Sequence, residues 1–270
     1  MVTFPNCKIN LGLNVLQKRE DGFHDIETVF FPIPIYDILE IVSSSTDTTE
    51  LKNTGLHISE DENNLCQKAY HLVKKDFPQL PEIKMHLHKV IPMGAGLGGG
   101  SADAAFTLLL LNKKYNLNIP EHQLYDYSLQ LGSDCPFFLL NHACLASGRG
   151  EILDPIQLSL SGYKMLIVNP GIHISTKEIF REILPAFPEK KIKDIIRQPL
   201  STWKDELIND FEKIVFQKNS QVKGIKENMY RHGAIYAAMT GTGSTVFGIF
   251  NTNENFDYSI ENHFYKWLSL

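Results

Sequence analysis

A chain of 270 residues, 43% hydrophobic and 21% charged, is long enough for two domains and typical of a globular protein with a sizeable core. A formal net charge of −5 argues against nucleic acid as a partner, and no apolar run is long enough to predict a membrane span. Four widely spaced cysteines without a CxxC pair are typical of reduced thiols. The N-terminus lacks the charged-then-apolar order of a signal peptide, so we expect a cytoplasmic protein.

The first predicted element is a strand near the N-terminus. Between residues 7 and 15, apolar side chains alternate with polar or small ones, which is the period of a strand with one buried face. We therefore expect a half-buried strand with Lys8 and Asn10 together on its polar face. Residues 83–88 alternate in the same way and predict a second strand.

The glycine-rich segment after that second strand is the most informative part of the sequence. Five of the seven residues from Gly94 to Gly100 are glycine, and such a segment loses much backbone entropy on folding. The N–H groups of a glycine loop can converge on an anion, and a helix that begins near Ser101 with that residue as N-cap adds its positive end. A turn without a ligand needs only one or two glycines. We therefore interpret the segment as a backbone cradle for phosphate, formed by Pro92, Gly94, Ala95, Gly96, Leu97, Gly98, Gly99, Gly100, Ser101 and Ala102.

Two common nucleotide-binding patterns do not fit this loop. The pattern GxGxxG formally matches residues 94–99, but the preceding strand is amphipathic and the acidic residue further on, Glu121, lies at a predicted helix start. The Walker pattern requires a lysine after the glycines, and none follows here.

The second half of the chain mixes strands and helices without regular alternation. We expect a helix over residues 121–131, a connector with a domain boundary within 148–162, and a strand over Lys164–Asn169. Ser175, with a glutamate three residues later, forms a capping box and predicts a helix start. Thr240–Ser244, TGTGS, predicts a glycine turn between two strands. This order favours an α+β fold over a doubly wound sheet.

The order Pro-x-x-x-Gly-Leu-Gly-Gly-Gly-Ser resembles the GHMP kinase superfamily. Four further segments are similar to the branch that acts on a cytidine diphosphate-linked polyol: NCKINLGLNV with REDGFHDIETVF, LGSDCPFF, NPGIHISTKEIF, and INDFE with TGTGSTVFG. The resemblance implies an N-terminal ATP-binding α+β domain over residues 1–158 and a C-terminal ferredoxin-like α+β substrate-binding domain over 159–270, with the active site between them. It also implies ATP and Mg²⁺ as cofactors.

The resemblance implies that Asp134 is the catalytic base and Lys8 its partner. Phosphoryl transfer to an alcohol needs positioning, charge neutralisation and a group that takes the hydroxyl proton. A nearby ammonium would keep Asp134 ionised and stabilise the transferring phosphoryl group. Taken alone, an aspartate between Gly-Ser and Cys-Pro would by default only cap a turn. Ser101 is expected to contact phosphate or Mg²⁺. Asp103 could also contact the metal ion, although the helix dipole explains an aspartate in the first turn without any ligand.

The substrate-binding residues implied by the resemblance are Asn10, Phe23, His24, Thr176, Phe180, Gly241, Thr242 and Gly243. Aromatic rings stack on a base such as cytosine, and a histidine can exchange hydrogen bonds with its polar edge. Relatives commonly carry tyrosine in place of Phe23 and a second serine in place of Ala102, so one hydroxyl is missing at each position. Phe180 alone would more often be a core residue, and the glycine turn could equally be a simple hairpin loop.

Two other functions stay open on the sequence. The chain could be a GHMP kinase for another alcohol, such as homoserine or mevalonate, although the GFH segment and Phe180 argue against this. It could also be a nucleotide-binding sensor without catalysis, but Lys8 and Asp134 argue against that because a sensor needs no base. We expect a monomer or a weak homodimer.

Overall fold

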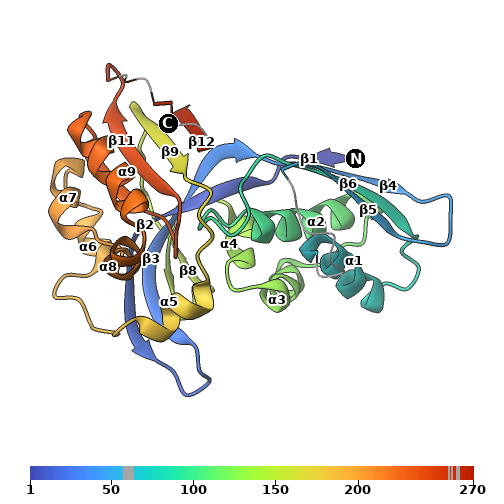
Figure 1. Cartoon of the computed structure of the whole chain (residues 1–270). Helices are drawn as coiled ribbons and strands as arrows, with labels where there is room; N and C mark the ends of the chain where they lie inside the picture. Colours follow the sequence, from blue (N-terminus) through green and yellow to red (C-terminus); the bar gives the residue numbers. More distant parts are fainter. Residues whose placement is uncertain (57–63, 255, 257, 260–261) are drawn as a thin grey trace. The chain divides into compact units, whose positions relative to one another are not determined.

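The computed structural model describes residues 1–56, 64–254, 256, 258–259 and 262–270 (Figure 1). The chain divides into two compact units that interleave along the sequence. Unit 1 consists of Met1–Cys7, Pro34–Met93 and Gly98–His142, and unit 2 of Lys8–Ile33, Gly94–Leu97 and Ala143–Leu270. The boundary expected after residue 158 would separate an ATP-binding domain from a substrate-binding domain, which is a different division from these two compact units. It stays a prediction.

Unit 1 contains a four-stranded sheet in the order β1-β4-β6-β5, in which only β5 and β6 pair in parallel. Helices α1, α2 and α3 lie on one side of this sheet (Figure 1), because the apolar side chains of β4 and β6 alternate with polar ones and pack against them. The elements are β1 (Val2–Thr3), β4 (Ile38–Ser43), β5 (Glu50–Gly55), β6 (Ile83–Lys89), α1 (Leu65–Asp76), α2 (Gly99–Tyr115), α3 (Glu121–Leu131) and α4 (Cys135–Leu140).

Unit 2 contains most of a sheet in the order β2-β3-β7-β8 and an antiparallel sheet in the order β10-β11-β9-β12. Its strands are β2 (Asn6–Lys18), β3 (His24–Tyr36), β7 (Cys144–Ser147), β8 (Ile152–Pro155), β9 (Tyr163–Asn169), β10 (Tyr236–Met239), β11 (Val246–Asn251) and β12 (Phe264–Ser269). Its helices are α5 (Thr176–Glu182), α6 (Ile192–Ile195), a 3₁₀ turn (Leu200–Thr202), α7 (Trp203–Glu206), α8 (Phe211–Lys218) and α9 (Ser220–Arg231).

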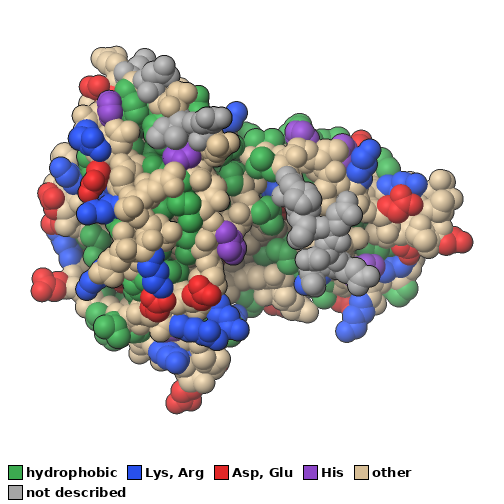
Figure 2. All heavy atoms as spheres, in the orientation of Figure 1, with side chains coloured by type: hydrophobic (Ala, Val, Ile, Leu, Met, Phe, Trp, Pro, Cys, Tyr) green, Lys and Arg blue, Asp and Glu red, His purple; other side chains and the backbone are tan. Residues whose placement is uncertain are grey.

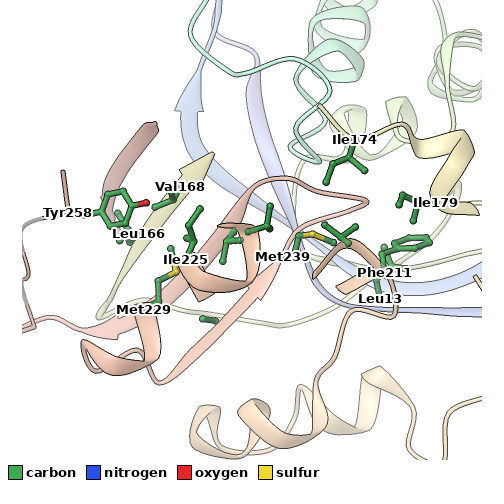
Figure 3. Packing of buried hydrophobic residues seen from close by; sticks show 14 of the residues in the cluster. Leu13, Leu166, Val168, Ile174, Ile179, Phe211, Ile225, Met229, Met239 and Tyr258 are labelled. Atoms are coloured by element: carbon green, nitrogen blue, oxygen red, sulfur yellow. The ribbon is translucent and has the colours of Figure 1, made fainter. Parts of the chain in front are cut away.

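The core of unit 2 joins the second sheet to the helices that pack on it. Figure 3 shows Leu166 and Val168 of β9 near Ile225 and Met229 of α9, with Met239 of β10 between this group and α8. On the face seen in Figure 2, basic and acidic side chains are interspersed over unit 2. Throughout the described part of the chain, each helix is too short or too polar to cross a membrane.

The mixture of helices with mainly antiparallel strands confirms the α+β prediction. Two local predictions are wrong. The first strand is not half-buried, because Lys8 and Asn10 on its polar face are only 3% and 2% exposed. The N-cap of α2 is Gly98, with a left-handed backbone, rather than Ser101, so the cap lies three residues earlier than expected and Ser101 is in the first turn of the helix.

Candidate functional site

The polar face of β2 forms an internal polar layer in unit 2. Lys8 Nζ donates to Asn10 Oδ1 at 2.7 Å, and it also lies 4.6 Å from the centroid of the Phe30 ring on β3. A buried ammonium is costly unless polar groups or an aromatic face compensate it. The contacts with Asn10 and Phe30 therefore explain how Lys8 is tolerated inside the protein, and they fix where its charge lies.

The glycine turn Thr240–Ser244 connects β10 to β11 and lies beside this layer. The hydroxyl of Thr240 accepts the main-chain N–H of Asn10 at 3.0 Å. Asn209 Nδ2 donates to the carbonyls of Met239 and Gly241, both at 2.8 Å. The turn between two strands is thus confirmed, and the side chain of Asn209 holds its conformation.

The tip of the glycine loop, Gly94–Leu97, packs against the same turn within unit 2. The main-chain N–H of Lys8 donates to the carbonyl of Leu97 at 3.0 Å, and Thr240 Oγ1 lies 3.0 Å from the carbonyl of Gly96. Gly96 has a φ of +77°, and a Cβ on it would overlap with the carbonyl oxygen of Thr240. Only glycine satisfies both conditions, so the loop approaches the turn as closely as a backbone can.

The other end of the loop belongs to unit 1, where it enters α2. Gly98 has a φ of +70°, and the helix proper begins at Gly99. The first N–H groups of a helix lack intrahelical partners and carry the positive end of its dipole, so they attract an anion. Burial raises the pKa of the Cys135 thiol to about 12, outweighing Ser101, which lowers that pKa. The contact of Ser101 with phosphate or Mg²⁺ stays a prediction.

A buried charge cluster ties the start of α2 to the end of β6. Lys89 Nζ donates to Asp37 Oδ2 and, at 2.7 Å, to Asp103 Oδ2. Asp37 Oδ1 accepts the N–H groups of Val90 and Ile91 at 2.6 and 2.9 Å. Burial raises the pKa of Asp103. Burial alone would lower the pKa of Lys89, but the carboxylates of Asp103 and Asp37 outweigh it, so the pKa of Lys89 is raised. The carboxylate of Asp103 thus pairs with a lysine that anchors the loop, which supplies a structural reason for its place in the helix.

The aromatic residues expected at the substrate lie on a hairpin and a helix of unit 2. The rings of His24 and Phe180 are 5.2 Å apart between centroids, inclined by 30°. Phe23 is 53% exposed, with the guanidinium of Arg149 at 4.8 Å from its ring centroid. Burial lowers the pKa of His24, and Lys18 lowers it further. A neutral imidazole held against a phenyl ring can accept or donate a hydrogen bond at a base edge.

Helix α5 meets the glycine turn through two hydroxyl groups. Thr176 Oγ1 and Thr242 Oγ1 are 3.0 Å apart. Ser175 is confirmed as the N-cap, because its Oγ accepts the N–H of Glu178 at 3.4 Å and Thr176 is the first residue of α5. The structure therefore brings Thr176 together with the turn that contains Gly241, Thr242 and Gly243.

The predicted catalytic pair is divided between the two units. Lys8 belongs to unit 2, and Asp134 belongs to unit 1, where it directly precedes α4 with Pro136 in the first turn. Their pairing stays a prediction. Within the described residues, histidine, cysteine and carboxylate side chains do not gather in threes as a metal site of their own would require.

Sequence reasoning missed Thr28, Lys89 and the turn contact of Thr240. Thr28, buried on β3, hydrogen-bonds to Asn10. The only sequence signal for such residues is a polar side chain among apolar strand residues, as at position 28 in ETVFF. That signal predicts burial with a partner but does not identify the partner.

Two family models match the chain: the N-terminal domain of GHMP kinases over residues 64–142 and the C-terminal domain of GHMP kinases over 188–257. The 4-diphosphocytidyl-2-C-methyl-D-erythritol kinase of Bacteroides fragilis is 51% identical, with 94% of this chain and 93% of that protein covered. The enzyme of the same name from Cytophaga hutchinsonii is 49% identical, with 97% of each covered.

Solved structures agree with these matches. The crystal structure of a 4-(cytidine 5'-diphospho)-2C-methyl-D-erythritol kinase superposes with a TM-score of 0.79 at 31% identity, covering 92% of this chain and 90% of that one. The mevalonate kinase of Methanococcus jannaschii superposes with a TM-score of 0.65 at 16% identity, covering 94% of this chain and 92% of that one, and shares the fold.

Proposed function

Because this chain belongs to the GHMP kinases, and among them to the 4-diphosphocytidyl-2-C-methyl-D-erythritol kinases, we propose that it phosphorylates the 2-hydroxyl of 4-diphosphocytidyl-2-C-methyl-D-erythritol with ATP. Such an enzyme serves the methylerythritol phosphate route to isoprenoid precursors. The structural observation that carries the proposal is the buried Lys8, whose side chain contacts Asn10 and whose main chain bonds to the glycine loop. An ammonium held by a neighbouring amide, on a residue whose main chain bonds to the glycine loop, suits phosphoryl transfer.

The glycine loop and the start of α2 would hold the triphosphate of ATP. Main-chain N–H groups of Gly98, Gly99 and Gly100, together with the helix dipole, supply a positive end without any basic side chain. This local arrangement matters because the protein as a whole carries a net charge of −5. Mg²⁺, when bound, would neutralise charge on the phosphates, and Ser101 is the residue proposed to contact it.

Asp134 and Lys8 would divide the chemistry at the acceptor. Asp134 takes the proton of the attacking hydroxyl, and the Lys8 ammonium stabilises negative charge on the transferring phosphoryl group. The carboxylate can be aimed because Asp134 directly precedes α4, whose Pro136 restricts the backbone. In this arrangement the reaction depends on positioning and charge rather than on a covalent enzyme intermediate.

The cytidine end of the substrate would lie against the aromatic residues of unit 2. His24 and Phe180 form a tilted ring pair beside which a pyrimidine ring could lie, with Phe23 exposed on the hairpin beside His24. Thr176 and the glycine turn with Gly241, Thr242 and Gly243 would hold the polar part of the substrate through hydroxyl and main-chain N–H groups.

We further propose that the protein acts in the cytoplasm as a monomer or weak homodimer, on a small molecule rather than on nucleic acid. The net charge of −5 supports a small molecule over nucleic acid, because the protein as a whole does not attract a polyanion. Size-exclusion chromatography with light scattering between low and high protein concentration would test the oligomeric state.

The deciding experiment compares alcohols as phosphoryl acceptors. Purified protein with ATP and Mg²⁺ should phosphorylate the cytidyl substrate and leave homoserine and mevalonate unchanged. Activity on homoserine alone would reject the proposed acceptor. ATP binding without turnover of any of the three would instead support the nucleotide sensor.

The role of Asp134 has its own test. Asp134→Asn should retain ATP binding while turnover falls by about 10²–10⁴, the range typical of a lost general base. Asp126→Asn, an exposed aspartate on α3 of the same unit, is the control for a change of one charge. If Asp134→Asn turns over like the control, Asp134 is not the base.

A further inference from the structure

A threonine outside the predicted site lies in the polar layer around Lys8. Thr28 on β3 is fully buried, with 0% of its surface exposed. Its hydroxyl donates to the carbonyl of Gly12 at 2.5 Å and lies 3.0 Å from Nδ2 of Asn10. A hydroxyl has one proton, and the carbonyl can only accept. Because that proton is used on Gly12, Thr28 must accept from Asn10.

The amide of Asn10 consequently has one favourable orientation. With Nδ2 toward Thr28, Oδ1 faces Lys8 Nζ at 2.7 Å and the hydroxyl of Thr240 at 3.2 Å. In the opposite orientation, the amide N–H groups would point at an ammonium, and Oδ1 would face a hydroxyl whose proton is already committed to Gly12. That arrangement would leave buried polar groups unpaired, at a cost of about 1–3 kcal/mol each.

We propose that Thr28 is a positioning residue for phosphoryl transfer, which acts through Asn10 to fix the place of the Lys8 ammonium. The inference rests on the catalytic role proposed for Lys8 above. Phe30 bounds Lys8 Nζ on a further side, at 4.6 Å from its ring centroid, so the ammonium is held between an amide oxygen and an aromatic face. A catalytic group displaced by about 1 Å can lose about 10² in rate.

The same contacts limit what Asn10 can do for a substrate. Lys8 faces one lone pair of its Oδ1, and Thr28 takes one of its two N–H groups. Thr240 Oγ1 lies 3.2 Å from this Oδ1 and 3.0 Å from the carbonyl oxygen of Gly96, and its single hydroxyl proton can serve only one of them. The substrate contact predicted for Asn10 is therefore left to its second N–H group and to the lone pair of Oδ1 that Thr240 approaches. The structure favours orientation of Lys8 as the main role of this side chain.

The test removes the hydroxyl of Thr28 and keeps its shape. In Thr28→Val, the Nδ2 of Asn10 loses its acceptor and the carbonyl of Gly12 loses its donor. These two groups can pair with each other only if the Asn10 side chain moves toward Gly12 and away from Lys8. We expect kcat to fall at least about tenfold, with the KM for ATP within about twofold of wild type. Thr28→Ser, which restores the hydroxyl, should return kcat to within about threefold.

A matched control separates positioning from stability. Thr107 on α2 is also fully buried and donates its hydroxyl to a main-chain carbonyl, that of Asp103, at 2.7 Å. Thr107→Val also loses a buried hydroxyl hydrogen bond, so its melting temperature should fall, by less than in Thr28→Val because one bond is lost rather than two, while kcat stays at the wild-type value. Equal kcat values in the two variants would show that the hydroxyl of Thr28 contributes to stability alone and overturn the proposal.

Two more variants keep the result unambiguous. If Thr28→Val does not fold, Asn10→Asp replaces it, because a carboxylate cannot donate to Thr28 and pairs directly with the Lys8 ammonium. Its kcat should fall by at least about tenfold with ATP binding retained, and a wild-type kcat would overturn the proposal. Lys8→Met separates the catalytic role proposed for Lys8 from the positioning role inferred for Thr28. Full activity of Lys8→Met would reject the catalytic role of Lys8. An inactive Lys8→Met together with an active Thr28→Val would reject only the positioning role of Thr28.

Discussion

The close approach of the glycine loop to the turn in unit 2 makes Gly96→Ala the most informative substitution. Gly96 has a φ of +77°, and the added methyl group would overlap with the carbonyl oxygen of Thr240. The loop and the turn would have to separate, which would break the contact between Thr240 Oγ1 and the carbonyl of Gly96. Gly162→Ala is the matched control, because Gly162 has a φ of +87° and open space at its Cβ position.

The expected magnitudes follow from two contributions. A left-handed backbone costs a residue other than glycine about 1–2 kcal/mol, and both variants share this cost. Gly96→Ala adds the loss of the hydrogen bond to Thr240, about 0.5–1.5 kcal/mol, and the displacement of the loop backbone. If this additional 1–2 kcal/mol falls on the ATP complex, affinity for ATP decreases by about 5–30-fold relative to the control.

Calorimetric titration with ATP, combined with thermal unfolding, measures both contributions. We expect Gly162→Ala to unfold at a lower temperature with unchanged ATP affinity, and Gly96→Ala to lose ATP affinity as well. Equal dissociation constants for ATP in the two variants would refute the view that contact with the turn shapes the phosphate loop.

Three further predictions concern the other buried contacts. Lys89→Met leaves the carboxylates of Asp37 and Asp103 buried without their cation and should lower the free energy of unfolding by about 3–5 kcal/mol in urea titrations; a loss below about 1 kcal/mol would contradict this. The lowered pKa of His24 means that its ring gains a proton only below pH 6.5. The contribution of neutral His24 to stability is therefore present above pH 6.5 and is lost as the pH falls through the lowered pKa. The KM for the cytidyl substrate should rise over the same pH interval. A KM that does not change with pH there would reject a neutral histidine at the cytosine base. Asn209→Ala leaves two main-chain carbonyls beside the glycine turn without donors and should lower the melting temperature and the affinity for the cytidyl substrate together, whereas lower stability with unchanged affinity would assign Asn209 to the fold alone.

Features that depend on neighbours in the chain were predictable from the sequence. The helix over 121–131 ends before Gly132 as expected, and Ser175 caps α5 through Glu178, three residues later. The glycine turn between β10 and β11 also follows from its local sequence. Each of these depends on backbone preferences and hydrogen bonds within a few residues, which a sequence displays directly.

Features that depend on distant partners were not predictable. The alternation of residues 7–15 correctly predicted a strand, but the same pattern suggested a single buried face. The polar face is buried because Asn10 meets Thr28, 18 residues away, and Thr240, 230 residues away. Periodicity records which residues share a face, and it contains no information on what packs against that face.

The sequence alone therefore determined the chemical class of this protein: the glycine order, with the segments around Lys8 and Asp134, identified a GHMP kinase because short motifs preserve the residue types that phosphoryl transfer needs. Tertiary structure alone decided which groups support those residues. Lys89 anchors the loop through Asp103, and Thr28 orients Asn10 toward Lys8. Such contacts become visible only on folding, because burial excludes water and obliges each polar group to find a partner wherever the chain brings one.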